Sequence, residues 1–156
     1  MKGDSMPKIM FVCHGNICRS PMAEFLMKDM VQKLGKADEF YIQSSATSRE
    51  EIGNPVHRGT KNKLAQYGIS VAGKYARQLT VKDYEEFDYI IAMDSNNLRN
   101  VDRIIGSDSL GKVSLLLDYA GRKGQSIADP WYTGDFDITY DDIMAGLKGL
   151  LKHLGY

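Results

Sequence analysis

The chain has 156 residues, of which 43% are hydrophobic, and its 20 basic and 20 acidic side chains cancel to a formal net charge of zero. This length supports one sizeable core and is too short for two ordinary domains, so we expect a single domain over 7–156 after a disordered N-terminus over 1–6. A balanced charge offers no global field to nucleic acid or to an anionic membrane, so any anion site must be local.

Two sequence features bear on location and metal content. No apolar run approaches the ~20 residues that span a bilayer, and the first residues lack the apolar stretch of a signal peptide, so we expect a cytoplasmic protein without membrane contact. The two cysteines, Cys13 and Cys18, have no accompanying ligand cluster. We therefore expect neither a disulfide framework nor a metal site.

The first predicted element is a buried strand over 8–12, because positions 9–12 are all apolar. A helix is predicted near 21–34, where Pro21 suits the first turn and apolar residues recur at three-to-four spacing. The residues between them, 13–20, therefore form a strand-to-helix turn.

This turn reads Cys-His-Gly-Asn-Ile-Cys-Arg-Ser, and it combines a nucleophile with an anion cradle. The first amides of a helix lack internal partners and can gather around an anion. Gly15 and Asn16 tolerate the left-handed backbone that lets successive amides converge. Arg19 adds a planar fork of donors that matches two phosphoryl oxygens. The same positive field favours the thiolate of Cys13.

We expect phosphate to be held mainly by the backbone amides of this loop, those of His14, Gly15, Asn16, Ile17, Cys18 and Arg19. A cysteine and an arginine at this spacing also arise by chance, and a buried cysteine is more often an inert apolar residue. The strand before the loop and the amphipathic helix after it favour the chemical interpretation.

The rest of the chain alternates short apolar runs with helical patterns. The predicted strands are 40–45, 89–93 and 113–116, and the predicted helices lie near 56–67, 80–86, 95–102 and 138–154. This alternation favours an α/β three-layer sandwich with a central, mainly four-stranded parallel sheet and helices on both faces. Ligands of such sheets bind beyond the carboxyl ends of the strands, which is where the Cys13 loop emerges.

Asp129 is the candidate proton donor, since a phenolate or alkoxide leaving group must be protonated as it departs. It precedes Pro130 in a glycine- and aspartate-rich segment over 128–137, which predicts an irregular loop over a site. Taken alone, an Asp-Pro pair more commonly starts a turn, so the residue pattern leaves both interpretations open.

Residues 12–24, Val-Cys-His-Gly-Asn-Ile-Cys-Arg-Ser-Pro-Met-Ala-Glu, resemble the amino-terminal signature of the low molecular weight protein tyrosine phosphatases. Residues 129–132, Asp-Pro-Trp-Tyr, resemble the acid loop of that family, and 76–80 and 87–94 also fit, so the resemblance covers nearly all of 8–154. It implies an enzyme that hydrolyses phosphotyrosine in proteins, or small aryl phosphates.

The resemblance also implies a mechanism. Cys13 attacks phosphorus, the loop amides and Arg19 stabilise the equatorial oxygens, and Asp129 protonates the leaving group before it activates water against the phosphocysteine. This scheme requires no metal or organic cofactor, and phosphate or vanadate should inhibit by filling the loop.

Supporting residues carry over from the family one at a time. Ser20 would hydrogen-bond the Cys13 sulfur, and Asn16, with Ser44, would brace the loop. Cys18 would trap an oxidised Cys13 as a reversible disulfide, although simple packing of Cys18 stays open.

Trp131 and Tyr132 would form a wall for an aromatic leaving group, although exposed aromatics after a turn are also ordinary packing. Glu50 departs from the family, which commonly has an aromatic there facing the Asp129 loop, and a carboxylate would disfavour acidic peptides. The family also often has a histidine just before 76–80, where this chain reads Ala-Gly-Lys-Tyr, and we assign no role to that stretch.

Three other functions share parts of the pattern. Thioredoxin-coupled arsenate reductases need further cysteines downstream, and none follows Cys18. A transfer subunit of a phosphotransferase system could carry a phosphocysteine but has no use for Arg19 or Asp129. A non-catalytic phosphate-binding module would tolerate the loss of Cys13 or Asp129, so the presence of both favours turnover.

Overall fold

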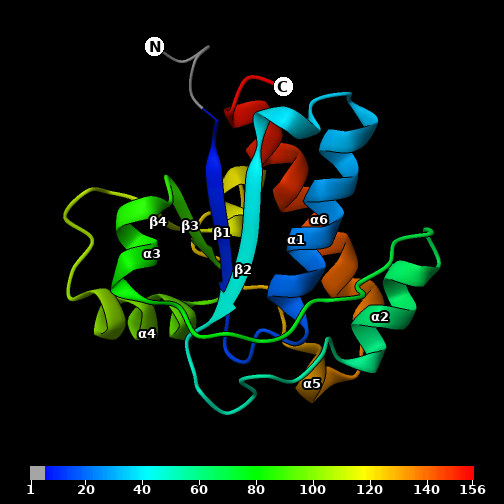
Figure 1. Ribbon diagram of the computed structural model, residues 1–156, viewed down its shortest axis with the longest axis horizontal. Coiled ribbons are helices and arrows are strands. Elements are labelled where there is room, and N and C mark those ends of the chain that lie inside the picture. The colour runs from blue at the N-terminus through cyan, green and yellow to red at the C-terminus, as the bar shows by residue number, and fades with distance from the viewer. Residues whose placement is uncertain (1–5) are drawn as a thin grey trace.

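The computed structural model describes residues 6–156, so most of the N-terminal segment expected to be disordered lies outside the described residues. Four strands form one parallel sheet with the order β2-β1-β3-β4 (Figure 1). The strands are β1 (Lys8–Cys13), β2 (Tyr41–Ala46), β3 (Tyr89–Ala92) and β4 (Val113–Leu115). Because β1 lies between β2 and β3, the loop that follows it leaves from the middle of the carboxyl edge.

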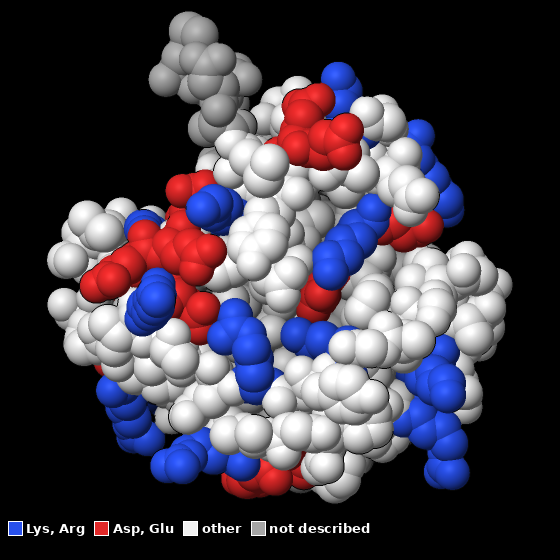
Figure 2. Space-filling view, viewed as in Figure 1, with Lys and Arg blue, Asp and Glu red and all other residues white. Residues whose placement is uncertain are grey.

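Helices cover both faces of the sheet, as Figure 1 shows. One layer holds α1 (Arg19–Lys33) and α6 (Phe136–His153), with α2 (Arg58–Ala65) packed against them, and the other holds α3 (Val81–Glu86) and α4 (Ser95–Ile105). The predicted three-layer sandwich is confirmed. Acidic and basic side chains are interspersed on the surface in Figure 2, in keeping with the balanced composition.

Strand β1 is buried on both faces and anchors the site. Ile9 and Phe11 pack into the core formed with α1 and α6, whereas Met10 and Val12 pack against residues of α3 and α4. All four side chains have no exposed surface. Successive strand side chains point to opposite faces, so a continuous apolar run is what two covered faces require.

The element boundaries differ from the prediction by a few residues, for local reasons. Helix α2 begins only at Arg58, because His57 is its N-cap and accepts a hydrogen bond from the amide of Gly59. Helix α1 begins at Arg19, two residues before Pro21, so part of the predicted turn is helical.

Three short elements were not predicted, because three to five residues are too few to show a helical period. They are η2 (Ala37–Glu39), η3 (Leu116–Ala120) and α5 (Pro130–Thr133). Helix α5 interrupts the segment expected to be an irregular loop. Within residues 6–156, no helix is long and apolar enough to cross a membrane.

Candidate active site

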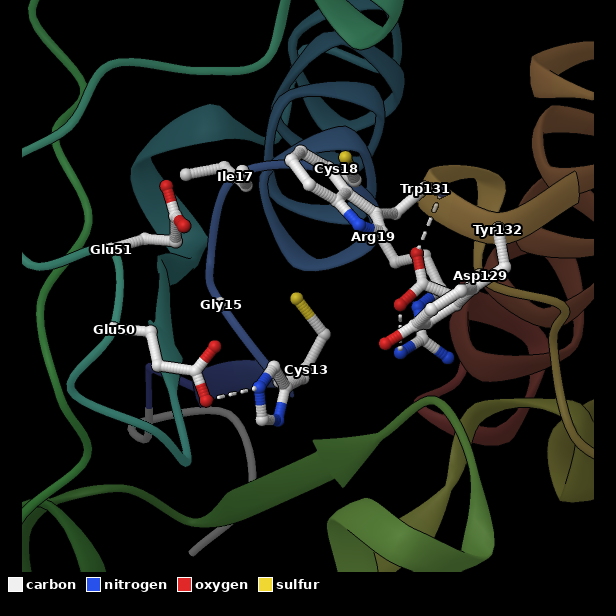
Figure 3. Close-up of a pocket in the computed structure, with 11 residues that line it drawn as sticks. Cys13, Gly15, Ile17, Cys18, Arg19, Glu50, Glu51, Asp129, Trp131 and Tyr132 are labelled. Atoms are coloured by element: carbon white, nitrogen blue, oxygen red, sulfur yellow. Dashed lines mark hydrogen bonds and ion pairs between the residues drawn. The ribbon is translucent and has the colours of Figure 1, made fainter. Parts of the chain in front are cut away.

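A small pocket of about 110 Å³ opens at the carboxyl end of β1 (Figure 3). Three segments far apart in sequence line it, and its residues are Cys13, His14, Gly15, Ile17, Cys18, Arg19, Glu50, Glu51, Asp129, Trp131 and Tyr132. Drug-sized ligands occupy pockets of roughly 300–1,000 Å³, so this one suits a much smaller group. The predicted nucleophile, arginine and acid all meet here.

The loop over 13–20 is shaped by Asn16 and Gly15 for different reasons. Asn16 has a φ of 59° and is the one non-glycine residue within 6–156 in the left-handed region. Gly15 does not have a positive φ, so the prediction for this residue was wrong. A Cβ at Gly15 would lie 3.2 Å from Cγ of Glu51, so the glycine instead makes room for the neighbouring segment.

The Cys13 sulfur is buried among hydrogen-bond donors, with 3% of the residue exposed. The backbone amides of Asn16 and Ser20 donate to Sγ at 3.3 and 3.4 Å, and Ser20 Oγ lies 3.1 Å from it. The N-cap of α1, Cys18, makes no side-chain cap hydrogen bond, and the Ser20 amide in the first turn of this helix donates to the sulfur instead. Amides at the start of a helix favour an anion bound beside the sulfur.

Asn16 connects the loop to two other segments. Its Nδ2 donates to Ser20 Oγ at 2.8 Å and to Ser44 Oγ at 2.9 Å, while its Oδ1 accepts the backbone amide of Arg77 at 3.2 Å. The Asn16–Ser44 contact expected from the family resemblance is present. Three anchors therefore hold the side chain of the one residue whose backbone conformation is unusual.

A buried ion pair, which sequence reasoning missed, lies beneath this network. Glu24 is 2% exposed, and its carboxylate accepts from Ser44 Oγ at 2.5 Å and lies 3.2 Å from Lys74 Nζ. Lys74 also donates to the backbone oxygen of Ser44 at 2.7 Å. Burial lowers the pKa of Lys74 below its ordinary value, against the effect of Glu24. Buried ion pairs seldom add net stability. This pair instead positions Ser44, whose hydroxyl is bound by Glu24 and whose backbone oxygen is bound by Lys74.

Part of the evidence for this ion pair is present in the sequence. Glu24 falls four residues after Ser20 on a helix whose neighbouring positions are buried, and a charged residue on such a face requires a partner. Lys28, four positions on along the helix, is one such partner, with Nζ 2.6 Å from Oε2 of Glu24, but nothing in the sequence identifies Lys74 as a second.

Arg19 is held rigidly from one side and is open on the other. It is 2% exposed, and its Nη1 donates to Asp94 Oδ2 at 2.6 Å and to the backbone oxygen of Ile127 at 2.9 Å. Its Nη2 makes only a long contact of 3.4 Å with Asp129, and within residues 6–156 its Nε has no partner. An unpaired buried donor costs about 1–3 kcal/mol, so this edge of the guanidinium is poised for an acceptor.

The surroundings of Arg19 stabilise its positive charge. Burial by itself lowers the pKa of the guanidinium, but Cys13, Asp94 and Asp129 outweigh burial and raise it above its ordinary value. Asp94, to which the sequence analysis gave no role, is thus the main anchor of the arginine. The signal that could have found it is an acidic residue two positions after the buried strand β3, which pairs with β1.

Asp129 serves as the N-cap of α5 and also faces the pocket. Its Oδ1 accepts the backbone amide of Trp131 at 3.0 Å, while Oδ2 lies near Arg19. Figure 3 shows its carboxylate on the far side of the pocket from Glu50, with the Cys13 sulfur between them. The turn-starting and the acid interpretations of the Asp-Pro pair are therefore compatible in one conformation.

The rim of the pocket is aromatic on one side and acidic on the other. Trp131 and Tyr132 are 58% and 83% exposed. Opposite them, Glu50 Oε2 lies 3.2 Å from Nε2 of His14 (Figure 3). Glu50 therefore lines the rim as expected, with a histidine of the loop as its partner.

The whole chain can be compared with known proteins. Residues 8–156 match the family described as low molecular weight phosphotyrosine protein phosphatase. The chain belongs to this family. It is 40% identical over 150 residues to the low molecular weight protein-tyrosine-phosphatase YfkJ of Bacillus subtilis, a match that covers 96% of each chain. The rat low molecular weight phosphotyrosine protein phosphatase is 37% identical over 148 residues, covering 92% of this chain and 93% of the rat protein.

Solved structures of the same family have the same fold as this chain. The crystal structure of YfkJ has a TM-score of 0.91 at 39% identity and covers 96% of this chain and 94% of its own. That of the low molecular weight protein tyrosine phosphatase SP-PTP from Streptococcus pyogenes has a TM-score of 0.85 at 42% identity, covering 97% and 95%. By these relatives the chain is a low molecular weight protein-tyrosine-phosphatase, as the sequence motifs predicted.

Both cysteines of the phosphatase are free thiols, and the surroundings of Cys18 decide its ionisation. Burial raises the pKa of Cys18 to about 12, with further contributions from Cys13 and Asp129. A thiol is neutral at pH values below its pKa, so Cys18 remains a thiol through the neutral range.

Iodoacetamide at neutral pH should therefore alkylate Cys13 and spare Cys18, because the thiolate is the reactive form. Fragmentation mass spectrometry of the tryptic peptide that contains both residues would locate the label. Phosphate should protect Cys13, and the unfolded chain, in which both thiols are exposed, should carry two labels. A single label on Cys18 of the folded enzyme would contradict this assignment.

Proposed function

We propose that this enzyme hydrolyses phosphotyrosine and aryl phosphate monoesters through a phosphocysteine intermediate on Cys13, with Asp129 as general acid and then general base. The observation that carries the proposal is the shared pocket. In it, the Cys13 sulfur lies among the amides of the loop, and Arg19 presents an Nε without a partner in the described chain.

In the first step, the Cys13 thiolate attacks phosphorus, the sulfur–phosphorus bond forms and the ester bond to the leaving oxygen breaks. The amides of 14–19, with Nε and Nη2 of Arg19, receive the three equatorial oxygens, whose charge they stabilise in the transition state. Asp129 donates its proton to the departing phenolate.

In the second step, water attacks the phosphocysteine, Asp129 takes the proton of that water, and the Cys13 thiolate leaves with phosphate as the product. Ser20 Oγ, 3.1 Å from the sulfur, stabilises the returning thiolate by a hydrogen bond. Neither step uses a metal or an organic cofactor. Phosphate and vanadate should compete for the same loop.

The substrate is either a phosphotyrosyl protein or a small aryl phosphate, whose ring would pack on Trp131 and Tyr132 at the rim. The principal alternative, a phosphate-binding module without turnover, requires neither a general acid nor an ionised cysteine. An assay of the acid role therefore separates the two.

Asp129→Asn should lower kcat for phenyl phosphate by about 10²-fold, because the amide has no proton to give to the phenolate. The loss should be much smaller for dinitrophenyl phosphate, whose leaving group departs without protonation. Phosphate release would be measured over a range of pH with chelator present.

Asp135→Asn is the matched control. Asp135 is the N-cap of α6 and accepts the amide of Ile138, as Asp129 accepts that of Trp131, but it does not line the pocket. Asparagine caps helices as well as aspartate does, so both variants should fold. Equal losses for both leaving groups in Asp129→Asn, or no turnover by the native chain while it still binds phosphate, would contradict the proposal.

A further inference from the structure

A second hollow adjoins the catalytic pocket. It is a groove of about 1260 Å³ between α2 and the segment 69–75, and it shares Ile17, Glu51 and Trp131 with the pocket. The catalytic pocket itself measures about 110 Å³. A phosphotyrosyl side chain that fills the pocket would therefore leave the groove open for the polypeptide on either side of that tyrosine.

The groove has an apolar floor and a basic margin. Val56 and Val71 are each 8% exposed and belong to the core beneath it. Arg58 and Lys61 line the groove from α2, are exposed, and make no ion pair with any residue of 6–156. Figure 2 shows basic side chains gathered over the region of α2.

Basic and acidic side chains therefore lie on different sides of the pocket. On the groove side, Arg58 and Lys61 are free cations, whereas Glu51, at the boundary with the pocket, is the one carboxylate that lines the groove within the described chain. On the side of Glu50, the rim carries a carboxylate whose side chain is 70% exposed. Such an arrangement attracts negative charge from one direction and repels it from the other.

We propose that this groove binds the polypeptide on one side of the phosphotyrosine and selects acidic side chains there. The inference rests on the proposed function, and it names the substrate class as an extended phosphotyrosyl polypeptide with acidic residues toward the groove. The groove is continuous with the pocket, so a chain anchored by its phosphotyrosine passes directly over Trp131 into it. Acidic residues on the opposite side of the phosphotyrosine would meet Glu50.

The test compares phosphotyrosyl peptides of equal length. Two acidic peptides carry three glutamates, one directly before the phosphotyrosine and the other directly after it. Each acidic peptide has a counterpart in which the three glutamates are replaced by glutamines. The kcat/KM of each peptide is divided by that of phenyl phosphate for the same enzyme. One acidic peptide should exceed its glutamine counterpart by about fivefold to tenfold, and the other should not. The gain should vanish near 1 M salt, where the Debye length is ~3 Å.

The double variant Arg58→Glu/Lys61→Glu should abolish that gain and make the acidic peptide poorer than its glutamine counterpart. An acidic residue in the first turn of α2 suits the helix dipole, so the variant should fold. The matched control is Lys148→Glu/Lys152→Glu, which makes the same change in net charge on exposed positions of α6 outside the groove. This control should preserve the gain.

Affinities of the same peptides for a Cys13→Ser variant, measured by fluorescence anisotropy, give a readout that does not depend on turnover. They should follow the same order. If both acidic peptides match their glutamine counterparts in rate and affinity, or if the control loses the gain as the groove variant does, the inference is overturned. Failure of the native chain to hydrolyse phenyl phosphate would instead overturn the proposed function, and the affinities would still decide the role of the groove.

Discussion

Cys13→Ser is expected to lower the turnover of phenyl phosphate by at least about 10⁴-fold while phosphate binding persists. The serine hydroxyl is a far weaker nucleophile at the pH values where a thiolate forms. The amides of Asn16 and Ser20, which donate to the sulfur at 3.3 and 3.4 Å, would remain in place to hold an anion. Chemistry and binding should thus separate in this variant.

Phosphate release measures the first effect, and calorimetric titration with inorganic phosphate measures the second. Rapid acid quenching of the native enzyme should trap phosphate on Cys13, whereas the variant should trap none. Retained turnover in Cys13→Ser would contradict the phosphocysteine intermediate. Loss of phosphate binding in a folded variant would show that the sulfur itself is required to shape the loop.

Arg19→Lys is expected to lower kcat/KM by about 10³-fold, because two donors that meet the transition-state oxygens are replaced by one point charge. The lysine also cannot reproduce the contacts of Nη1 with Asp94 and the Ile127 carbonyl, at 2.6 and 2.9 Å, that orient the open edge of the guanidinium. Affinity for vanadate should fall in parallel, since it engages the same edge.

Arg77→Lys provides the comparison. Arg77 also uses two nitrogens, which donate to Asp83 at 2.9 and 3.1 Å, but its side chain does not line the pocket. Loss of this partly exposed pair should cost at most about 1 kcal/mol of stability and change kcat/KM little. A kcat/KM for Arg19→Lys within tenfold of the native value would contradict the role of the guanidinium fork.

Much of the candidate site was predictable because its parts are contiguous. The loop over 13–20 contains the candidate nucleophile, the arginine and the amides in eight successive residues. The strand before the loop and the helix after it are apparent from local patterns. Asp129 was predicted as the acid because chemistry demands a proton donor and because 129–132 resembles a family motif. The Asn16–Ser44 contact was inferred from the same resemblance, and Asn16 alone carries the positive φ.

The parts that escaped prediction are pairings across the chain. Asp94 reaches Arg19 from 75 positions away, and Lys74 approaches Glu24, with which it shares no local pattern. Gly15 was expected to supply a left-handed backbone, yet its role is to accommodate Glu51. In each case the partner is decided by which loops the sheet brings to one edge.

The sequence by itself therefore predicted the candidate reactive groups and the layered fold, because backbone conformation, helix termini and the strand-helix alternation depend on near neighbours. Only the tertiary structure decided how the reactive groups are held and what surrounds them. The anchoring of Arg19 by Asp94, the buried Glu24–Lys74 pair and the basic groove beside the pocket arise from the packing of distant segments around β1. Such contacts depend on the relative placement of whole elements, which local periodicity does not encode.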